Sequence, residues 1–423
     1  MRIEQLRFSE ILDSRGIPTV EATVVLEDGA VGVMGVPSGK SVGTHEALEK
    51  RDTHLPRYHG KGLQQCLETA QNTLRDQLIG QHFQDFRALD IKMIEIDGTP
   101  QKSNVGANFI LGISGAFAKA CANHCDAPLY RYLAGVTNMS LPEYMPKPMV
   151  NIINGGAHAD NTLSIQEFML VPIKRRPFCE YIRMISEIFH TLKILLHKKG
   201  LSTNVGDEGG FAPLIQRTTD VFDFLSEATE KAGYVLGEDI GFALDCAANH
   251  FYENGRYVLD QESLSVSEYS DVLSYFCQQY PIISIEDPIV EDDFEGWKTI
   301  TRNLPDCMIV GDDVFVTQQQ RLRKGIANGA ANSILIKPNQ VGTLTETLQT
   351  IAVAREYDYD IVVSHRSGET TDTFIADFAY AVAAPYVKFG SVSRGERVCK
   401  YNRLQQISSC LMTSNLHCPP IPR

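Results

Sequence analysis

Six short apolar segments in the second part of the sequence each end in an ionisable residue. These end residues are Asp245, Glu286, Asp312, Lys337, His365 and Lys388. The last five follow one another at intervals of about 23 to 28 residues, the length of one strand plus one helix. Because parallel strands of a barrel end at one mouth, this register predicts a single polar site there.

The three acidic members of this set predict a metal site. Carboxylates that meet in a poorly hydrated mouth repel one another unless a cation joins them, and all-oxygen ligation favours Mg²⁺. Asp245, Glu286 and Asp312 are therefore candidate Mg²⁺ ligands; the alternative is that each is a solvated loop acid. Lys337 on the next strand could act as a base, because a nearby divalent ion and exclusion of water make its neutral form accessible. The alternative for Lys337 is a simple ion pair.

Two further acids suggest proton transfer to a leaving group. Glu208 lies in a glycine-rich segment, residues 205–210, that lets the backbone approach a ligand closely, and Glu167 lies in residues 165–169. Paired carboxylates opposite a lysine could protonate a departing group, although each alone could equally be a structural ion-pair partner.

An anion site is predicted just after the fifth of these strands. His365, Arg366 and Ser367 are consecutive, and arginine offers a planar fork and serine a hydroxyl to a phosphate. Lys388 could pair with a carboxylate.

Residues 37–44 (PSGKSVGT) superficially resemble a phosphate-binding P-loop. That motif requires glycine at position 34, where Met34 stands, and a strand-to-helix setting that is missing here. We interpret the segment as a mobile lid loop in which Ser41 supplies a hydroxyl ligand.

The elements that carry these residues fall into two parts. A β-hairpin is predicted from residues 20–26 and 30–36, and helices from residues 61–80 and 104–134. From about residue 145, apolar strands alternate with amphipathic helices, one of them opening with the capping-box pair Thr343 and Glu346. We predict an α/β protein: an α+β N-terminal domain over residues 1–135, which carries the lid loop, and an irregular (β/α)8-type barrel domain over residues 145–423.

Composition limits the functional classes. The 423 residues carry a net charge of −13, which argues against a nucleic-acid or anionic-membrane binder. No apolar run approaches the ~20 residues of a membrane helix, and no signal peptide is evident. None of the ten cysteines forms a C-x-x-C pair, so we expect reduced thiols in the cytoplasm. The cluster Cys121, His124 and Cys125 is better explained as a helix face than as a metal site, because no second ligand pair follows.

Several motifs in combination resemble those of the enolase family. They are residues 11–16 (ILDSRG), 37–39 (PSG), 46–49 (EALE), 106–108 (GAN), 151–156 (NIINGG), 158–161 (HADN), 206–210 (GDEGG), 333–337 (SILIK), 339–340 (NQ), 343–346 (TLTE) and 364–369 (SHRSGE). They span nearly the whole chain and include Glu208, Lys337 and residues 365–367.

The resemblance implies a function and a role for each matched position. The reaction would be the reversible dehydration of 2-phosphoglycerate to phosphoenolpyruvate, with two Mg²⁺ ions per active site. Lys337 would remove the C2 proton, and Glu208 with Glu167 would assist departure of the C3 hydroxyl. Asp245, Glu286 and Asp312 would hold one Mg²⁺, and Ser41 the second. The substrate pocket would be lined by His158, Gln166, Arg366, Ser367 and Lys388, with His365 close by. The family also implies a homodimer or a ring of dimers, and in some members a cell-surface location besides the cytoplasm.

A few positions depart from the family pattern. Ile17 replaces the usual Asn, Lys40 and Val42 flank Ser41 where Ala and Thr are usual, and Ala157 precedes His158. Two other functions therefore stay open: a related metal-dependent lyase or racemase acting on another acid, and a non-catalytic paralogue. An unphosphorylated substrate would leave Ser41, Arg366 and Ser367 without a role, and a non-catalytic protein would be expected to have lost Lys337 or Glu208.

Overall fold

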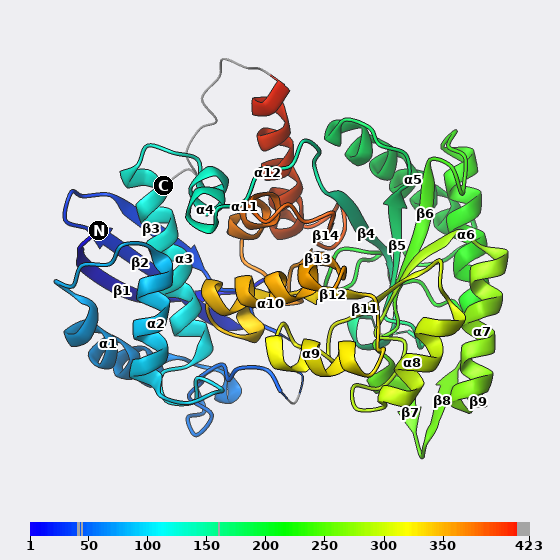
Figure 1. The fold of residues 1–423 in the computed structure, drawn as a ribbon. Helices are drawn as coiled ribbons and strands as arrows, with labels where there is room; N and C mark the ends of the chain where they lie inside the picture. The colour runs from blue at the N-terminus through cyan, green and yellow to red at the C-terminus, as the bar shows by residue number, and fades with distance from the viewer. Residues whose placement is uncertain (40–42, 44, 160, 413–423) are drawn as a thin grey trace.

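The computed structural model describes residues 1–39, 43, 45–159 and 161–412. Ser41, Lys40 and Val42 of the predicted lid loop lie outside the described residues. Figure 1 shows an N-terminal sheet with its helices on one side of the molecule and a barrel surrounded by helices on the other.

The N-terminal part is an antiparallel meander covered by helices. Its strands are β1 (Ile3–Leu12), β2 (Pro18–Leu26) and β3 (Val31–Gly35), in that order, so the predicted hairpin is confirmed. The helices are α1 (Gln64–Leu78), α2 (Phe86–Asp97), α3 (Ala107–His124) and α4 (Leu129–Thr137). The sequence patterns did not predict α2. Helix α3 packs so closely on the sheet that a Cβ at Gly32 would stand 1.9 Å from the carbonyl oxygen of Ala116.

The single helix predicted over residues 104–134 is wrong. It is two helices, because the chain turns between them at Asp126, which has a positive φ of 48°, and at Pro128, which precedes α4. Proline cannot donate the backbone hydrogen bond that a continuing helix requires. Helix α1 lies within the helix predicted over residues 61–80.

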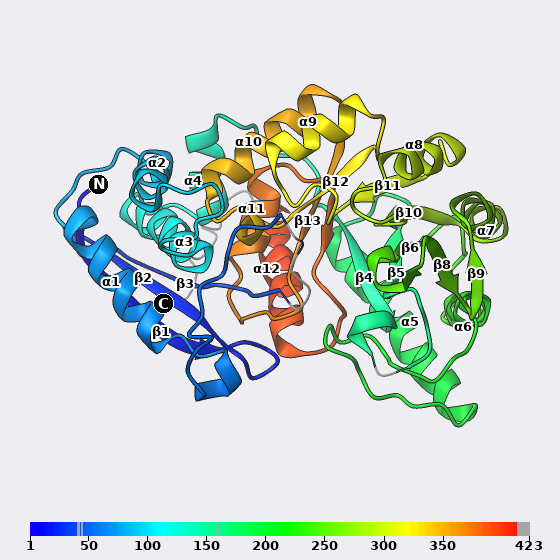
Figure 2. The ribbon, with the colours of Figure 1, turned by 90° about the horizontal axis from the view of Figure 1, so that it is seen from below.

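The second part is a closed barrel of eight strands. Figure 2 shows this part from below, with helices such as α8 and α9 on its outside. In chain order the strands are β4 (Lys147–Asn154), β5 (Glu167–Pro172), β6 (Ile240–Asp245), β10 (Ile282–Glu286), β11 (Met308–Gly311), β12 (Ser333–Ile336), β13 (Asp360–Ser364) and β14 (Tyr386–Lys388). The surrounding helices are α5 (Phe178–Lys198), α6 (Thr218–Lys231), α7 (Val266–Gln279), α8 (Phe294–Asn303), α9 (Gln319–Ala327), α10 (Leu344–Glu356), α11 (Phe374–Ala381) and α12 (Gly395–Met412). The predicted fold class is therefore confirmed.

One strand breaks the all-parallel pattern that simple alternation predicts. Strand β5 is antiparallel to both β4 and β6, whereas the other neighbouring pairs are parallel. Among its described residues, the connection from β4 to β5 contains the short 3-10 helix Gly156–His158 and no longer helix, so the chain returns directly along its neighbour. Two helices in succession, α5 and α6, then bring the chain back to β6.

Short elements lie outside this frame. The 3-10 helices Arg57–Gly60, Ala248–Phe251 and Pro338–Gln340, and a small sheet of β7 (Tyr252–Glu253), β8 (Arg256–Leu259) and β9 (Glu262–Leu264), complete the described structure. Among the described residues, no helix has the length and apolar character to cross a membrane.

Polar contacts join the N-terminal part to the barrel. Helix α10 begins after Thr343, whose hydroxyl accepts the N–H of Glu346, as the capping pattern predicted. The Glu346 carboxylate does not bind the Thr343 backbone, so the capping box is incomplete. It accepts a hydrogen bond from the Thr343 hydroxyl instead, and it forms an ion pair with Lys102 Nζ at 2.7 Å. The cap of a barrel helix thus also anchors the N-terminal part.

Candidate active site

The strand ends converge on one polar recess of about 510 Å³ at the barrel mouth. Its lining includes these predicted site residues: His158, Gln166, Glu167, Glu208, Asp245, Asp312, Lys337, His365, Arg366, Ser367 and Lys388. Glu286 is buried beside Lys388 rather than in the lining. Ser41 lies outside the described residues. Five of the six strand-end residues, Asp245, Asp312, Lys337, His365 and Lys388, therefore line one recess, as the strand-end register predicted.

A buried ammonium holds three of the carboxylates. Lys388 Nζ lies 2.8 Å from Asp245 Oδ2, 2.8 Å from Glu286 Oε2 and 3.2 Å from Glu167 Oε1. Burial raises the pKa of Asp245, but the charge and hydrogen bond of Lys388, together with the charges of Lys337 and His158, outweigh it, so the pKa falls below its ordinary value. Burial and the charge of Asp245 raise the pKa of Glu286 to about 8, although the positive charge of Lys388 acts in the opposite direction. The single positive charge of Lys388 does not balance the three carboxyl groups that surround it.

Lys337 forms an ion pair with the third predicted metal ligand. Its Nζ contacts Asp312 Oδ2, while Asp312 Oδ1 accepts Gln340 Nε2 at 2.9 Å. Burial is the largest single influence on Lys337 and lowers its pKa, but the negative charges of Asp312 and Glu286 act against it and the net shift is upward. This ion pair favours the protonated form of Lys337.

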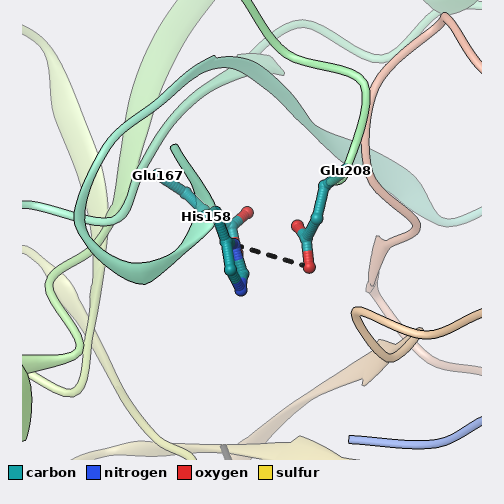
Figure 3. A group of neighbouring side chains, drawn as sticks. All are labelled: His158, Glu167 and Glu208. Carbon is teal, nitrogen blue, oxygen red and sulfur yellow. Dashed lines mark ion pairs between the residues drawn. The ribbon is translucent and has the colours of Figure 1, made fainter. Parts of the chain in front are cut away.

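A second group of polar side chains in the recess contains two glutamates and a histidine. Figure 3 shows His158, Glu167 and Glu208 turned toward one another, with His158 Nδ1 3.7 Å from an oxygen of each glutamate. Glu167 opens strand β5, and Glu208 lies in the loop after α5. Asn151 Nδ2 donates to Glu208 Oε2 at 3.3 Å.

The two glutamates of this group differ in ionisation. Burial and the neighbouring Glu208 raise the pKa of Glu167 well above its usual range. Burial also raises the pKa of Glu208, but His365, His158 and Arg397 together bring it well below that range. Of the two, Glu167 therefore holds a proton more readily than Glu208.

The anion loop, residues 365–368, is bound by the N-terminal part. Arg366 makes a two-bond contact with the carboxylate of Glu46, at 2.9 and 3.1 Å, and donates to Asn339 Oδ1 at 3.1 Å. Both Arg366 and Glu46 are buried. Gly368 exchanges two backbone hydrogen bonds with Ser38, just before the lid residues. Two flanks of the lid loop therefore attach to the same anion loop.

Carboxylate oxygens on neighbouring strands are the ligands that Mg²⁺ prefers. Asp245, Glu286 and Asp312 come from β6, β10 and the end of β11, which are adjacent. The raised pKa of Glu286 marks an unbalanced buried negative charge that a cation would relieve. This donor set fits a hard divalent ion. The closest ligand groups among the described residues are, however, two others: His158 with Glu167 and Glu208, and Asp287 with Asp312 and Asp313.

Sequence reasoning missed several residues of the site. Glu46 was noted only as part of a motif, and Arg397, Asn151 and Asp287 were not singled out. The carboxylate of Asp287 accepts the backbone N–H groups of Asp312 and Asp313, at 2.8 and 2.9 Å, and so orients Asp312. The only available signal for Asp287 was its place directly after the strand-end acid Glu286.

The remaining residues noted in the sequence analysis have the following contacts and positions in the structure. His124 pairs with Asp28 at 2.5 Å near the sheet edge, and Cys121 is buried inside α3. Gln166 donates to Asp245 Oδ2 at 3.3 Å. Ile17 pairs with Asp13 in the turn after β1. Ala157 lies in the 3-10 helix that carries His158.

Fold and site together define an α/β-barrel protein with an α+β N-terminal domain and an acidic, lysine-containing mouth. Comparison with protein-family models gives the family. Residues 3–133 match the enolase N-terminal domain, and residues 142–417 match the enolase C-terminal TIM barrel domain. The chain therefore belongs to the enolase family, which indicates an enolase-like lyase function.

Proposed function

We propose that this protein catalyses the reversible, Mg²⁺-dependent dehydration of 2-phosphoglycerate to phosphoenolpyruvate in glycolysis and gluconeogenesis. The observation that carries the proposal is the arrangement of one recess. The recess is lined by Lys337 with its ion-pair partner Asp312, by the glutamates Glu167 and Glu208, whose pKa values are shifted in opposite directions, and by Arg366 and Ser367. Each part corresponds to one requirement of a proton abstraction followed by loss of hydroxide.

The chain's own residues provide the two proton transfers. Lys337, once free of its proton, removes the proton from C2 of the substrate. Glu167 is the protonated member of the acid pair and Glu208 the ionised one, so together they can deliver a proton to the C3 hydroxyl, which leaves as water. Arg366 and Ser367 would bind the phosphate, with His158, Gln166 and His365 around the substrate.

The proposed metal ligands are Asp245, Glu286 and Asp312, with Ser41 for a second ion. Bound Mg²⁺ would supply positive charge against the extra negative charge that develops on the substrate carboxylate. Lys388, already held by Asp245 and Glu286, adds an ammonium to the same region. We also propose a homodimer or a ring of dimers in the cytoplasm, as the family resemblance implies.

The test follows product formation directly. Purified protein is mixed with 2-phosphoglycerate and Mg²⁺, and the ultraviolet absorbance of the enol product is recorded with and without a chelator. Rapid, chelator-sensitive product formation supports the proposal. Folded, metal-loaded protein without turnover would favour another phosphorylated acid or a non-catalytic role. Lys40→Ala and Val42→Thr would then be the first reversions to examine.

A further inference from the structure

A buried arginine joins the two catalytic loops of the barrel mouth. Arg397 lies in the first turn of α12 and is fully buried. Its Nη1 is 2.6 Å from His365 Nδ1 and 2.6 Å from the carbonyl oxygen of Arg366. Its Nη2 donates to the carbonyl oxygens of Ser367, at 2.6 Å, and Asp207, at 3.2 Å. Arg397 thus binds the anion loop and the loop of Glu208 at once.

The contact with His365 fixes which imidazole nitrogen carries the proton. A guanidinium group has five N–H donors and no acceptor, so His365 Nδ1 must accept the hydrogen bond from Arg397. The imidazole is then neutral, with its proton on Nε2. That nitrogen lies 3.2 Å from Glu208 Oε2, so it donates to the carboxylate. The other tautomer would direct N–H toward N–H on one side and a lone pair toward a carboxylate on the other.

We propose that Arg397 is a positioning residue that holds His365 as the neutral Nε2–H tautomer and, through it, orients Glu208 for the loss of the C3 hydroxyl. Arg397 does not touch the substrate recess; it acts through His365 and through three backbone carbonyls. The part of this inference that concerns the leaving group rests on the proposed dehydration. The tautomer of His365 does not rest on it.

The packing around this contact is close. Gly390 has a φ of +81°, and a Cβ there would lie 2.9 Å from Arg397 Cδ, 2.9 Å from the Glu208 carbonyl oxygen and 3.0 Å from His365 Cε1. Two side chains and one backbone carbonyl, from three separate segments, therefore converge on one glycine. The backbone N–H of Ser391 also donates to the Glu208 carbonyl oxygen at 2.9 Å.

The charges that face His365 agree with a neutral ring. Burial lowers the pKa of His365 to about 3; Glu208 acts in the opposite direction, while Arg397 and Lys388 lower it further. A ring that stays neutral can donate only through Nε2 while Nδ1 accepts. Glu208 then receives a directed hydrogen bond rather than a second positive charge.

The direct test is a nitrogen NMR spectrum of protein labelled with ¹⁵N-histidine, with His365 assigned from the spectrum of His365→Gln. The expected result is a neutral His365 with the proton on Nε2 that does not titrate between about pH 5 and about pH 8. A protonated ring or an Nδ1–H tautomer in the unmodified protein would overturn the inference. This measurement needs no substrate, so it remains decisive even if the protein does not dehydrate 2-phosphoglycerate.

A matched pair of variants tests the consequence for catalysis. Arg397→Met removes the donors at nearly constant volume, and Arg403→Met is the control. Arg403 is also buried on α12, but it binds Asp377 at 2.7 Å, away from the recess. Two rates are measured: exchange of the C2 proton with D₂O, which reports on Lys337, and formation of phosphoenolpyruvate.

The expected outcome is a split between the two rates. Arg397→Met should lower product formation by about 100-fold or more, because loss of the correct imidazole tautomer is costly in comparable sites. Exchange should fall by less than about tenfold, and His365 should begin to titrate. Arg397→Lys retains one donor toward Nδ1 and should restore part of the product formation. Equal loss of both rates, matched by Arg403→Met, would mean that Arg397 is only structural. If Arg397→Met does not fold, the tautomer of the unmodified protein and the rate ratio of Arg397→Lys still decide.

Discussion

A buried aspartate between the N-terminal part and the barrel makes stability depend on pH in an unusual direction. Asp90 on α2 is fully buried, and its Oδ2 accepts the backbone N–H and the hydroxyl of Thr345 on α10, at 2.9 and 2.7 Å. Burial raises the pKa of Asp90 to about 7, although the hydrogen bonds from Ser114 and Thr345 oppose it. The perturbation that tests this is Asp90→Asn, which keeps the shape of the side chain and removes its charge.

The sign and size of the effect follow from proton binding. The folded protein binds a proton on Asp90 more tightly than the unfolded chain, so the stabilising contribution of the protonated group is complete below about pH 4 and is lost as the pH rises to about 7. At about 1.4 kcal/mol per tenfold change, a pKa of about 7 in place of 3.8 lowers the free energy of unfolding by about 4 kcal/mol at high pH. Asparagine avoids this cost. Its advantage over aspartate should grow by roughly 2 to 3 kcal/mol between about pH 5 and about pH 8.

The assay is urea-induced unfolding of both proteins at these two pH values, followed by circular dichroism. Asp97→Asn is the matched control, because Asp97 is equally buried on α2 but accepts the backbone N–H groups of Thr99, Asn104 and Val105. An amide loses part of that accepting capacity, so the control should be destabilised at both pH values by about 1 to 3 kcal/mol. If Asp90→Asn changes stability equally at both pH values, Asp90 does not carry the proposed buried charge and the reasoning fails.

Three further predictions concern the recess. Lys337→Ala should abolish exchange of the C2 proton with solvent while leaving Mg²⁺ binding, measured by titration calorimetry, largely intact; retained exchange would exclude Lys337 as the base. Asp312→Asn should weaken Mg²⁺ binding in the same calorimetric experiment, and unchanged affinity would remove Asp312 from the ligand set. Glu46→Gln should raise KM for 2-phosphoglycerate about tenfold, because one of the two charged hydrogen bonds that hold Arg366 becomes weaker. An unchanged KM would show that Arg366 does not need Glu46 for its position.

The strand-end residues could be predicted from the sequence because a barrel turns a one-dimensional register into a common mouth. Asp245 and Lys388 are far apart in the chain, yet Asp245 Oδ2 lies 2.8 Å from Lys388 Nζ because both residues end barrel strands at the same mouth. Glu46 and Arg397 do not follow from any strand register. Glu46 reaches the site from the N-terminal part and Arg397 from a helix behind the barrel wall, so only the packed structure shows their contacts.

Local patterns failed where tertiary structure sets the outcome. The apolar spacing across residues 104–134 continues through the turn at Asp126, so periodicity alone could not show that α3 ends there. The direction of β5 depends on the missing crossover helix between β4 and β5, and alternation of strand and helix does not encode it. In both cases the sequence predicted the type of element, and the connection determined its geometry.

The contacts of the anion loop explain why this barrel needs its N-terminal part for chemistry as well as for stability. Arg366 would meet the substrate phosphate, yet its orientation depends on Glu46. The neighbouring Gly368 is paired through its backbone with Ser38. Arg397 holds the same loop from the barrel side, through the carbonyl oxygens of Arg366 and Ser367. A side chain fixed from both sides loses little conformational entropy when an anion binds, so the two parts of the chain would together preorganise the proposed phosphate site.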